Sequence, residues 1–181
     1  MANRITIFRA FLIPIFITAS VYYRPEHTFL KWVPLAVFLT ACLSDALDGY
    51  IARAYNEKSF FGQVLDPIAD KLLLASGFLS VYFCPYFPIK PPAWVVILVC
   101  SRDVFIISGI AVIYLTSGTL RADPSYLGKA TTFFQMITVM AMLVPWHIAD
   151  VLWYVTALFT LASGAAYLWR EVDRSKVHVA S

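Results

Sequence analysis

The sequence predicts an all-α integral membrane protein with six transmembrane helices and a polar active site at the cytoplasmic membrane boundary. Hydrophobic residues make up 60% of the 181-residue chain, and the mean hydropathy is +0.73. Both values exceed those of ordinary soluble domains. Apolar runs that approach the roughly 20 residues needed to cross a hydrocarbon core recur along nearly the whole chain. Four aspartates gather at the facing ends of two of these runs.

Each predicted helix is an apolar run bounded by charged residues, proline or glycine. The first follows Arg9, the second ends before Arg53, the third begins at Asp66-Pro67, and the fifth opens with Gly128-Lys129. The six runs, with ends placed to within roughly 2–4 residues, span residues 8–23, 32–52, 66–84, 93–116, 128–145 and 148–169.

The connections between these runs are short, and the sequence shows no repeat or linker composition. We therefore expect a single domain over residues 1–181, with a short N-terminal interfacial segment and a short basic C-terminal tail. Thr18-Ala19-Ser20 is similar to a signal-peptidase site. Because cleavage there would remove the first helix, we expect this segment to be retained.

The distribution of basic residues predicts that both termini are cytoplasmic, because short loops rich in Lys and Arg remain on that side. This orientation gives nine basic residues inside, which are Arg4, Arg9, Arg53, Lys58, Arg121, Lys129, Arg170, Arg174 and Lys176, against Arg24, Lys31 and Lys90 outside. The lack of a transit peptide favours a bacterial inner membrane. A net charge of +3 suits anionic membrane lipids and gives no reason to expect nucleic acid.

Two pairs of carboxylates lie at the cytoplasmic ends of the second and third predicted helices. A charged side chain inside a span costs about 2.5–3.5 kcal/mol on insertion scales, so such residues are rare without a function. Helical spacing places Asp45 with Asp48, and Asp66 with Asp70, on one face each. Four converging negative charges predict a divalent metal site. The donors are all carboxylate oxygens, which favour Mg²⁺ or Mn²⁺, and two such ions would cancel the four charges.

The structural alternatives concern single aspartates. Asp66 before Pro67 fits a helix N-cap followed by proline at the first helical position. Asp45 has possible ion-pair partners in Arg53 and Lys71. Capping and ion pairing each explain one carboxylate, whereas a metal site explains all four.

The stretch reads Asp45-x2-Asp48-Gly49-x2-Ala52-Arg53-x8-Gly62-x3-Asp66-x3-Asp70. It resembles, at every fixed position, the signature of the CDP-alcohol phosphatidyltransferase family. The resemblance implies that the aspartates hold two Mg²⁺ or Mn²⁺ ions, and that Asp70 is also the catalytic base for the acceptor hydroxyl. It implies that Asp48, Gly49, Ala52, Arg53 and Gly62 bind the CDP-lipid. It further implies CDP-diacylglycerol as donor, CMP as a product and a homodimer.

The acceptor alcohol depends on residues outside this signature. Ser101-Arg102-Asp103-Val104, the segment Leu127 to Thr132 and Gln135 resemble cardiolipin synthases that use CDP-diacylglycerol. Phosphatidylglycerophosphate synthases usually show Arg-Glu in the fourth helix and further basic residues where this chain has Ile110 and Thr131. A less basic pocket favours phosphatidylglycerol over the dianion glycerol 3-phosphate. Glycerol 3-phosphate remains the alternative, and an inositol phosphate ranks lower.

Candidate acceptor or phosphate ligands are Arg102, Lys129 and Arg9. For Arg102 the alternative is a structural ion pair with Asp103, and for Arg9 it is a basic anchor on an interfacial helix. A cation transporter is the non-enzyme alternative for the whole chain. The gathering of the acids at one face, in one half of the chain, favours the enzyme.

Overall fold

The computed structural model describes residues 2–24, 26, 29–55, 60–117 and 126–179. These residues form six α-helices and one 3₁₀ turn, Leu30–Trp32. The helices are α1 (Ala2–Val21), α2 (Val33–Tyr55), α3 (Phe60–Phe83), α4 (Ala93–Ser117), α5 (Tyr126–Leu143) and α6 (Ala149–Val179). The predicted all-α fold is therefore confirmed, helix by helix and in the predicted order.

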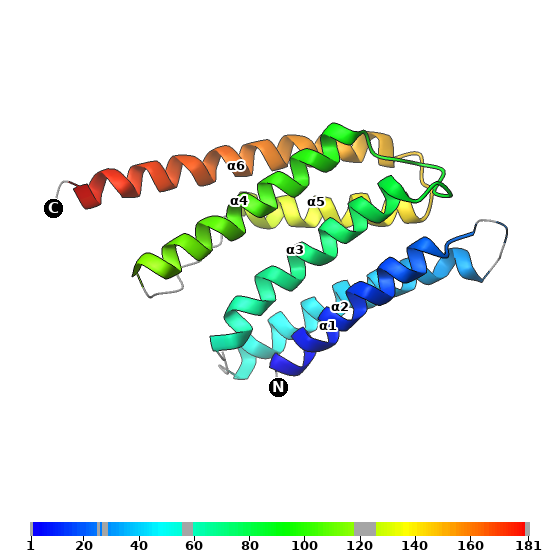
Figure 1. Cartoon of the computed structure of the whole chain (residues 1–181), viewed down its shortest axis with the longest axis horizontal. Helices are drawn as coiled ribbons and strands as arrows, with labels where there is room; N and C mark the ends of the chain where they lie inside the picture. The colour runs from blue at the N-terminus through cyan, green and yellow to red at the C-terminus, as the bar shows by residue number, and fades with distance from the viewer. Residues whose placement is uncertain (1, 25, 27–28, 56–59, 118–125, 180–181) are drawn as a thin grey trace.

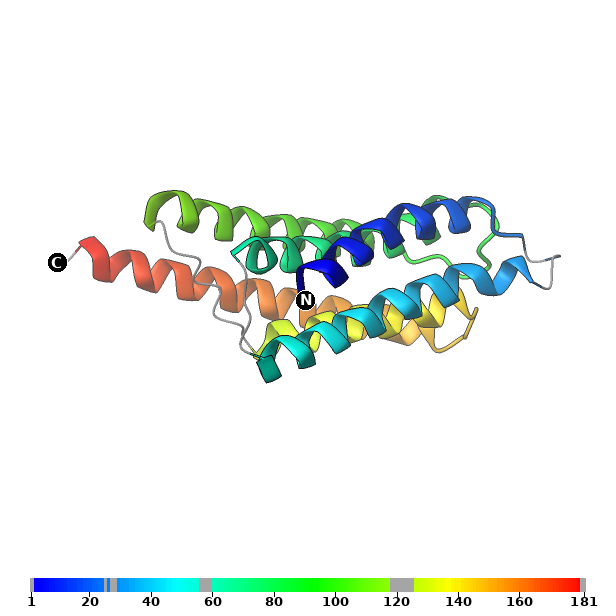
Figure 2. The ribbon, with the colours of Figure 1, turned by 90° about the horizontal axis from the view of Figure 1, so that it is seen from below.

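Successive helices run in opposite directions, so the bundle has two distinct ends (Figures 1 and 2). One end holds the start of α1, the end of α2 and the start of α3. The start of α5 and the ends of α4 and α6 point toward the same side. Even numbers of antiparallel helices bring both chain termini to one side, as the charge distribution predicts. We call this side the aspartate end, because it carries the signature residues.

Apolar side chains between neighbouring helices hold the bundle together. Helix α1 packs against α2 and α3, and α5 packs against α6. Between α1 and α2, the rings of Phe16 and Phe38 lie 5.6 Å apart, and both side chains are fully buried. Leu74 and Phe78 of α3 are also fully buried. Burying side chains of this size stabilises a fold by about 1.5–3 kcal/mol each in water, and their close packing positions the helices here.

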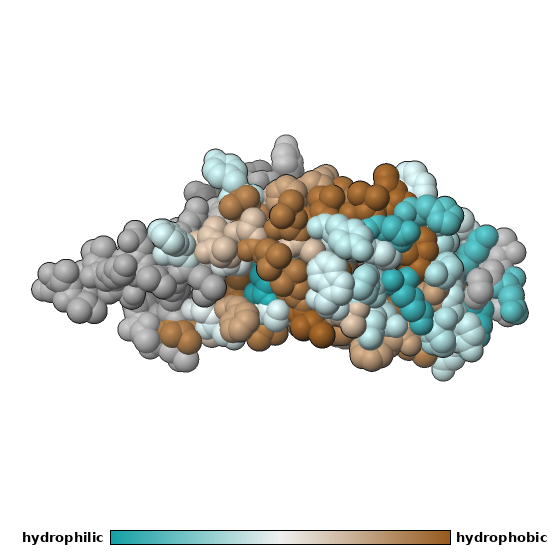
Figure 3. Space-filling model, turned by 90° about the horizontal axis from the view of Figure 1, so that it is seen from above, coloured by the Kyte–Doolittle hydropathy of each residue, from teal (hydrophilic) through white to brown (hydrophobic). Residues whose placement is uncertain are grey.

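The outer surface carries large apolar side chains, as expected where helices face lipid. Phe11, Phe105 and Leu158 each expose about two thirds of their surface. Figure 3 shows apolar residues across the middle of one face and polar residues toward the end opposite the aspartate end. Within the described part of the chain, Ala149–Tyr167 is the helix segment long and apolar enough to cross a membrane. The six-span arrangement therefore remains a prediction.

Several helices extend beyond the predicted apolar runs. Helix α1 begins at Ala2, so the predicted interfacial segment is continuous with it. Helix α3 begins at Phe60, and α6 continues to Val179 through the predicted C-terminal tail. Backbone hydrogen bonding continues a helix past the edge of its apolar stretch, because polar residues in water tolerate the helical conformation. The apolar runs thus locate the helices and underestimate their length.

Candidate active site

The four signature aspartates lie on two helices that meet at the aspartate end. Asp45 and Asp48 belong to the C-terminal half of α2, and Asp66 and Asp70 to the N-terminal half of α3. The two helices are in contact. The helical backbone at 45–48 and 66–70 confirms the predicted periodicity, which places each pair on one helix face.

The structure also decides one alternative for this segment. Because α3 begins at Phe60, Asp66 lies inside the helix and is not its N-cap. Most signature side chains lie outside the described residues, namely those of Asp45, Asp48, Gly49, Ala52, Arg53, Gly62 and Asp66. Among the side chains that the structure describes, no three acidic, histidine or cysteine groups converge on a metal position. The predicted metal ligands therefore stay a prediction.

Asp70 is the one signature aspartate whose side chain is described. It is half-buried, and its Oδ1 atom is shielded from solvent. It lies one residue before Lys71, in the half of α3 that approaches the aspartate end. The two roles predicted for Asp70, metal ligand and catalytic base, stay predictions.

Next to Asp70, a buried ion cluster connects α3 to α4. The Lys71 Nζ atom lies 3.2 Å from Asp103 Oδ1, and Arg102 Nη1 donates to the same oxygen at 2.7 Å. The side chains of Asp103 and Arg102 expose only 4% and 6% of their surfaces, and that of Lys71 exposes 12%. A single carboxylate oxygen therefore binds two cations in a region of low dielectric constant.

Hydrogen bonds extend this cluster to α5 and α6. Lys71 Nζ donates to Thr132 Oγ1 at 3.2 Å, and Arg102 Nη2 donates to Ser163 Oγ at 2.7 Å. We call the five residues Lys71, Arg102, Asp103, Thr132 and Ser163 the Asp103 cluster. It joins four helices through side chains that are far apart in the sequence. Buried charges require such partners, because desolvation costs several kcal/mol per ion.

The other two predicted acceptor ligands occupy different environments. Arg9 on α1 is 1% exposed, so it is not the surface anchor considered as an alternative. Lys129, in the first turn of α5, is exposed. The ion-pair alternative for Arg102 is confirmed, since its guanidinium binds Asp103.

Comparison with known proteins decides the class of this site. Residues 1–162 match the CDP-alcohol phosphatidyltransferase family. The chain belongs to this family. It is 33% identical over 193 residues to the CDP-diacylglycerol–glycerol-3-phosphate 3-phosphatidyltransferase of Bacillus subtilis, covering 97% of each protein. It is 36% identical over 172 residues to the cardiolipin synthase (CMP-forming) of Rattus norvegicus, covering 81% of this chain and 54% of that protein.

A protein of Mycobacterium tuberculosis named as a phosphatidylglycerophosphate synthase is 33% identical over 180 residues, covering 95% of this chain and 81% of that protein. The chain is thus a membrane-bound phosphatidyltransferase of phospholipid synthesis, as the signature predicts. Because the chain belongs to an enzyme family, the alternative interpretation as a cation transporter is excluded. The acceptor alcohol is not decided, because relatives of both names match.

The contacts of Lys71 in this phosphatidyltransferase were not predicted from the sequence. The sequence indicated Asp45 as its partner, whereas its described partners are Asp103 and Thr132. A signal was present in the sequence, since a lysine and an aspartate inside neighbouring spans are expected to pair. The register of two helices was needed to identify that pair.

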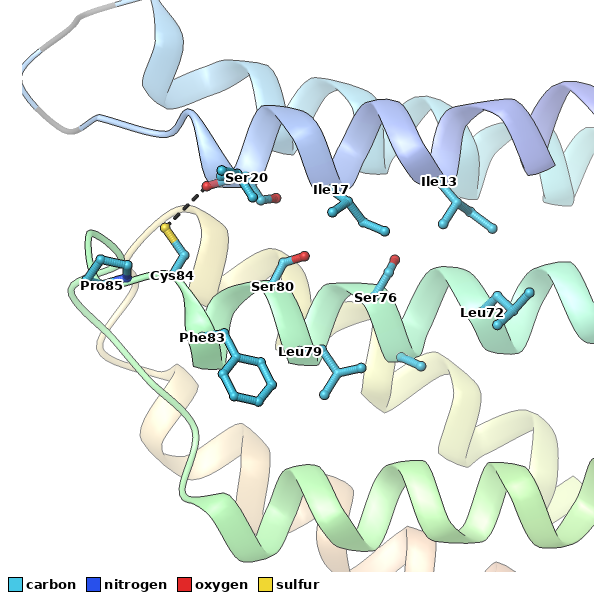
Figure 4. A pocket seen from close by; sticks show the side chains of 12 residues that line it. Ile13, Ile17, Ser20, Leu72, Ser76, Leu79, Ser80, Phe83, Cys84 and Pro85 are labelled. Carbon is cyan, nitrogen blue, oxygen red and sulfur yellow. Dashed lines mark hydrogen bonds between the residues drawn. The ribbon is translucent and has the colours of Figure 1, made fainter.

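The phosphatidyltransferase also has an apolar groove between α1 and α3, which extends from Leu72 to Pro85 (Figure 4). It has a volume of about 560 Å³ and is lined mainly by residues such as Ile17, Leu79 and Phe83. Near Pro85, Cys84 Sγ donates to the Ser20 carbonyl at 3.2 Å. None of the described residues that line this groove is charged.

Proposed function

We propose that this phosphatidyltransferase transfers the phosphatidyl group of CDP-diacylglycerol to phosphatidylglycerol, which yields cardiolipin and CMP. The observation that carries the choice of acceptor is the charge of the Asp103 cluster. Its two cations share one carboxylate, so the three charged side chains sum to a single positive charge. A single charge complements the monoanionic phosphodiester of phosphatidylglycerol better than the dianion glycerol 3-phosphate.

Positions expected to be basic in phosphatidylglycerophosphate synthases support the same choice. Thr131 is fully buried, and its hydroxyl oxygen lies 2.7 Å from the Leu127 carbonyl oxygen and 3.0 Å from that of Phe159. This residue therefore joins α5 to α6 and adds no positive charge. The side chain of Ile110 lies outside the described residues, and its apolar character likewise adds none.

In the proposed reaction, Asp70 accepts the proton of the acceptor hydroxyl. The hydroxyl oxygen forms a bond to the β-phosphorus of the donor, on the lipid side of the diphosphate, and the bond from that phosphorus to the bridging oxygen breaks. CMP leaves with that oxygen. Asp45, Asp48, Asp66 and Asp70 would hold Mg²⁺ or Mn²⁺, which supplies charge neutralisation and Lewis acidity to the phosphoryl oxygens. Paired aspartates on one face of α2 and of α3 fit such hard cations.

We further propose roles for the remaining predicted ligands. Asp48, Gly49, Ala52, Arg53 and Gly62 bind the CDP-lipid, whose diphosphate must lie near the aspartates. Arg102, Lys129 and Arg9 contribute positive charge for phosphate groups at the aspartate end. The buried position of Arg9 suits a substrate inside the bundle, and the exposed position of Lys129 suits one that enters from the membrane surface.

The proposed setting is a bacterial inner membrane, with six spans and both termini in the cytoplasm. The antiparallel helices and the location of both termini at the aspartate end support this orientation. We also propose a homodimer, as the family resemblance implies. Exposed apolar side chains on α3 and α4, such as Leu72 and Phe105, provide surface for lipid or a second copy.

Glycerol 3-phosphate is the second candidate acceptor. Its support is the alignment, since the chain covers nearly all of the Bacillus subtilis enzyme whose name includes that acceptor. The corresponding product is phosphatidylglycerophosphate, and the donor and the released CMP are the same.

Product analysis distinguishes the two acceptors. Purified protein is given CDP-diacylglycerol, Mg²⁺ or Mn²⁺, and either phosphatidylglycerol or glycerol 3-phosphate, and CMP and lipid products are measured. Cardiolipin formation supports the first proposal. Phosphatidylglycerophosphate formation without cardiolipin contradicts it and supports the second. A lack of CMP with every acceptor and metal contradicts the proposed donor.

A further inference from the structure

The Asp103 cluster contains a carboxylate that binds two cations through one oxygen. Lys71 and Arg102 both contact Asp103 Oδ1, at 3.2 and 2.7 Å. Without this oxygen, two positive charges would lie close together in a region of low dielectric constant, where they repel strongly. Asp103 therefore determines where both cations lie.

The location of the cluster relates it to the acceptor. Lys71 directly follows Asp70, the proposed base, and consecutive helical residues point about 100° apart around the axis. Asp70 and Lys71 therefore lie on adjacent sides of α3. Lys71 points toward α4 and α5, where it contacts Asp103 and Thr132. In both candidate acceptors a three-carbon glycerol unit separates the attacking hydroxyl from the phosphate, so an acceptor whose hydroxyl reaches Asp70 can extend its phosphate toward the Lys71 side of α3.

Two polar atoms of the cluster lack a partner among the described residues. They are Asp103 Oδ2 and Arg102 Nε, and both are buried. Asp103 Oδ2 can accept a hydrogen bond from a ligand hydroxyl, Arg102 Nε can donate one to a ligand oxygen, and the Lys71 ammonium can bind a phosphate. Phosphatidylglycerol and glycerol 3-phosphate share this phosphoglycerol chemistry. Buried polar atoms are costly when unpaired, so a bound ligand would stabilise this arrangement.

We propose that Asp103 is a positioning residue for the acceptor: through Oδ1 it holds the Lys71 ammonium where it binds the acceptor phosphate, beside Asp70. This inference rests on the proposed reaction, but not on which of the two acceptors is used. Lys71 is the most exposed of the three charged side chains, at 12%, so it is the group that a phosphate meets. Asp103 acts through Lys71 and need not touch the reacting atoms.

The test is a kinetic comparison of Asp103→Glu and Thr132→Val with the unchanged chain, in detergent or vesicles. Asp103→Glu keeps the charge but displaces the carboxylate, and Thr132→Val removes the hydroxyl that accepts from Lys71. We expect Asp103→Glu to raise the KM for the acceptor about tenfold, which corresponds to about 1.4 kcal/mol of binding free energy. Thr132→Val should raise it several-fold. The KM for CDP-diacylglycerol should stay unchanged in both.

Thr138→Val is the matched control, because Thr138 makes a hydrogen bond of the same kind on the same helix. Its hydroxyl lies 2.7 Å from that of Thr156 on α6, outside the Asp103 cluster. This variant should change neither KM. Asp150→Asn provides a second control, since Asp150 is an exposed carboxylate at the start of α6.

The separation of the two KM values decides between positioning and a purely structural role. A lower kcat with both KM values unchanged in Asp103→Glu and Thr132→Val overturns the proposal, because loss of folded protein reduces only the active fraction. An equal change in the KM for CDP-diacylglycerol also overturns it. If the unchanged chain releases no CMP, the proposed reaction fails instead. If the protein uses glycerol 3-phosphate as its acceptor, the same test applies, and the concentration of glycerol 3-phosphate is varied.

Discussion

Lys71 Nζ and Asp103 Oδ1 lie 3.2 Å apart and join α3 to α4 inside the bundle. The same oxygen binds Arg102 at 2.7 Å. Since α3 also carries Asp66 and Asp70, this ion pair helps fix the rotation of the helix that presents half of the signature aspartates. A contact outside the signature thereby affects the orientation of residues within it.

Removal of the Asp103 charge is expected to destabilise the fold. Asp103→Asn leaves Lys71 and Arg102 without their shared anion, and breaking a buried pair in this way costs about 3–5 kcal/mol. The midpoint of unfolding in detergent, followed by helical circular dichroism, should fall strongly. The double variant Lys71→Met with Asp103→Asn removes one unpaired charge and should recover part of the loss. A double variant less stable than either single variant contradicts the pairing.

Asp70→Asn is expected to abolish turnover while it preserves binding of CDP-diacylglycerol. The amide has no basic carboxylate to accept the proton of the acceptor hydroxyl, and removal of a general base commonly costs 10²–10⁴-fold or more in rate. CMP release measures turnover, and direct binding of the nucleotide lipid is measured separately. Asp150→Asn, at the opposite end of the bundle, is the control. Normal turnover in Asp70→Asn contradicts its role as the base.

The helices and the aspartate pairs could be predicted from the sequence, because both depend on local patterns. Apolar runs located all six described helices, and spacings of three and four placed each aspartate pair on one face. The ends of α1, α3 and α6 were predicted too short, since polar residues continue these helices beyond the apolar stretch.

The partner of Lys71 could not be predicted in the same way. Its contacts with Asp103 and Thr132 depend on the relative rotation of α3, α4 and α5, and Thr132 is 61 residues away in the sequence. The Arg102–Asp103 pair, between neighbours in the chain, was recognised as an alternative because it needs no such long-range information. Local chemistry was therefore more predictable than contacts between helices.

Asp66→Asn is expected to weaken metal dependence and activity together. One of four proposed carboxylate ligands loses its charge, so a higher concentration of Mg²⁺ or Mn²⁺ should be needed for half-maximal CMP release. A metal titration at fixed substrate measures this shift. Thr138→Val should titrate like the unchanged chain, because Thr138 lies between α5 and α6. An unchanged titration curve in Asp66→Asn contradicts its role as a ligand.

Gly77 on α3 is expected to be essential for close packing against α5. A Cβ atom at this position would lie 2.9 Å from Val139 Cγ1 and 3.1 Å from Val139 Cγ2, closer than side chains normally approach. Overpacking of this kind typically costs about 1–3 kcal/mol, so Gly77→Ala should lower the unfolding midpoint. The double variant Gly77→Ala with Val139→Ala should recover stability, because it removes the two methyl groups in question.

Gly164 offers the matched control for this prediction. A Cβ atom there would lie 3.9 Å from Arg102 Cγ, which is an ordinary contact. Alanine has the higher helix propensity by about 1 kcal/mol, so Gly164→Ala should be neutral or stabilising. If Gly77→Ala is as well tolerated as Gly164→Ala, then α3 and α5 are not in close contact at Gly77, and the helix arrangement that places Lys71 beside Thr132 would need revision.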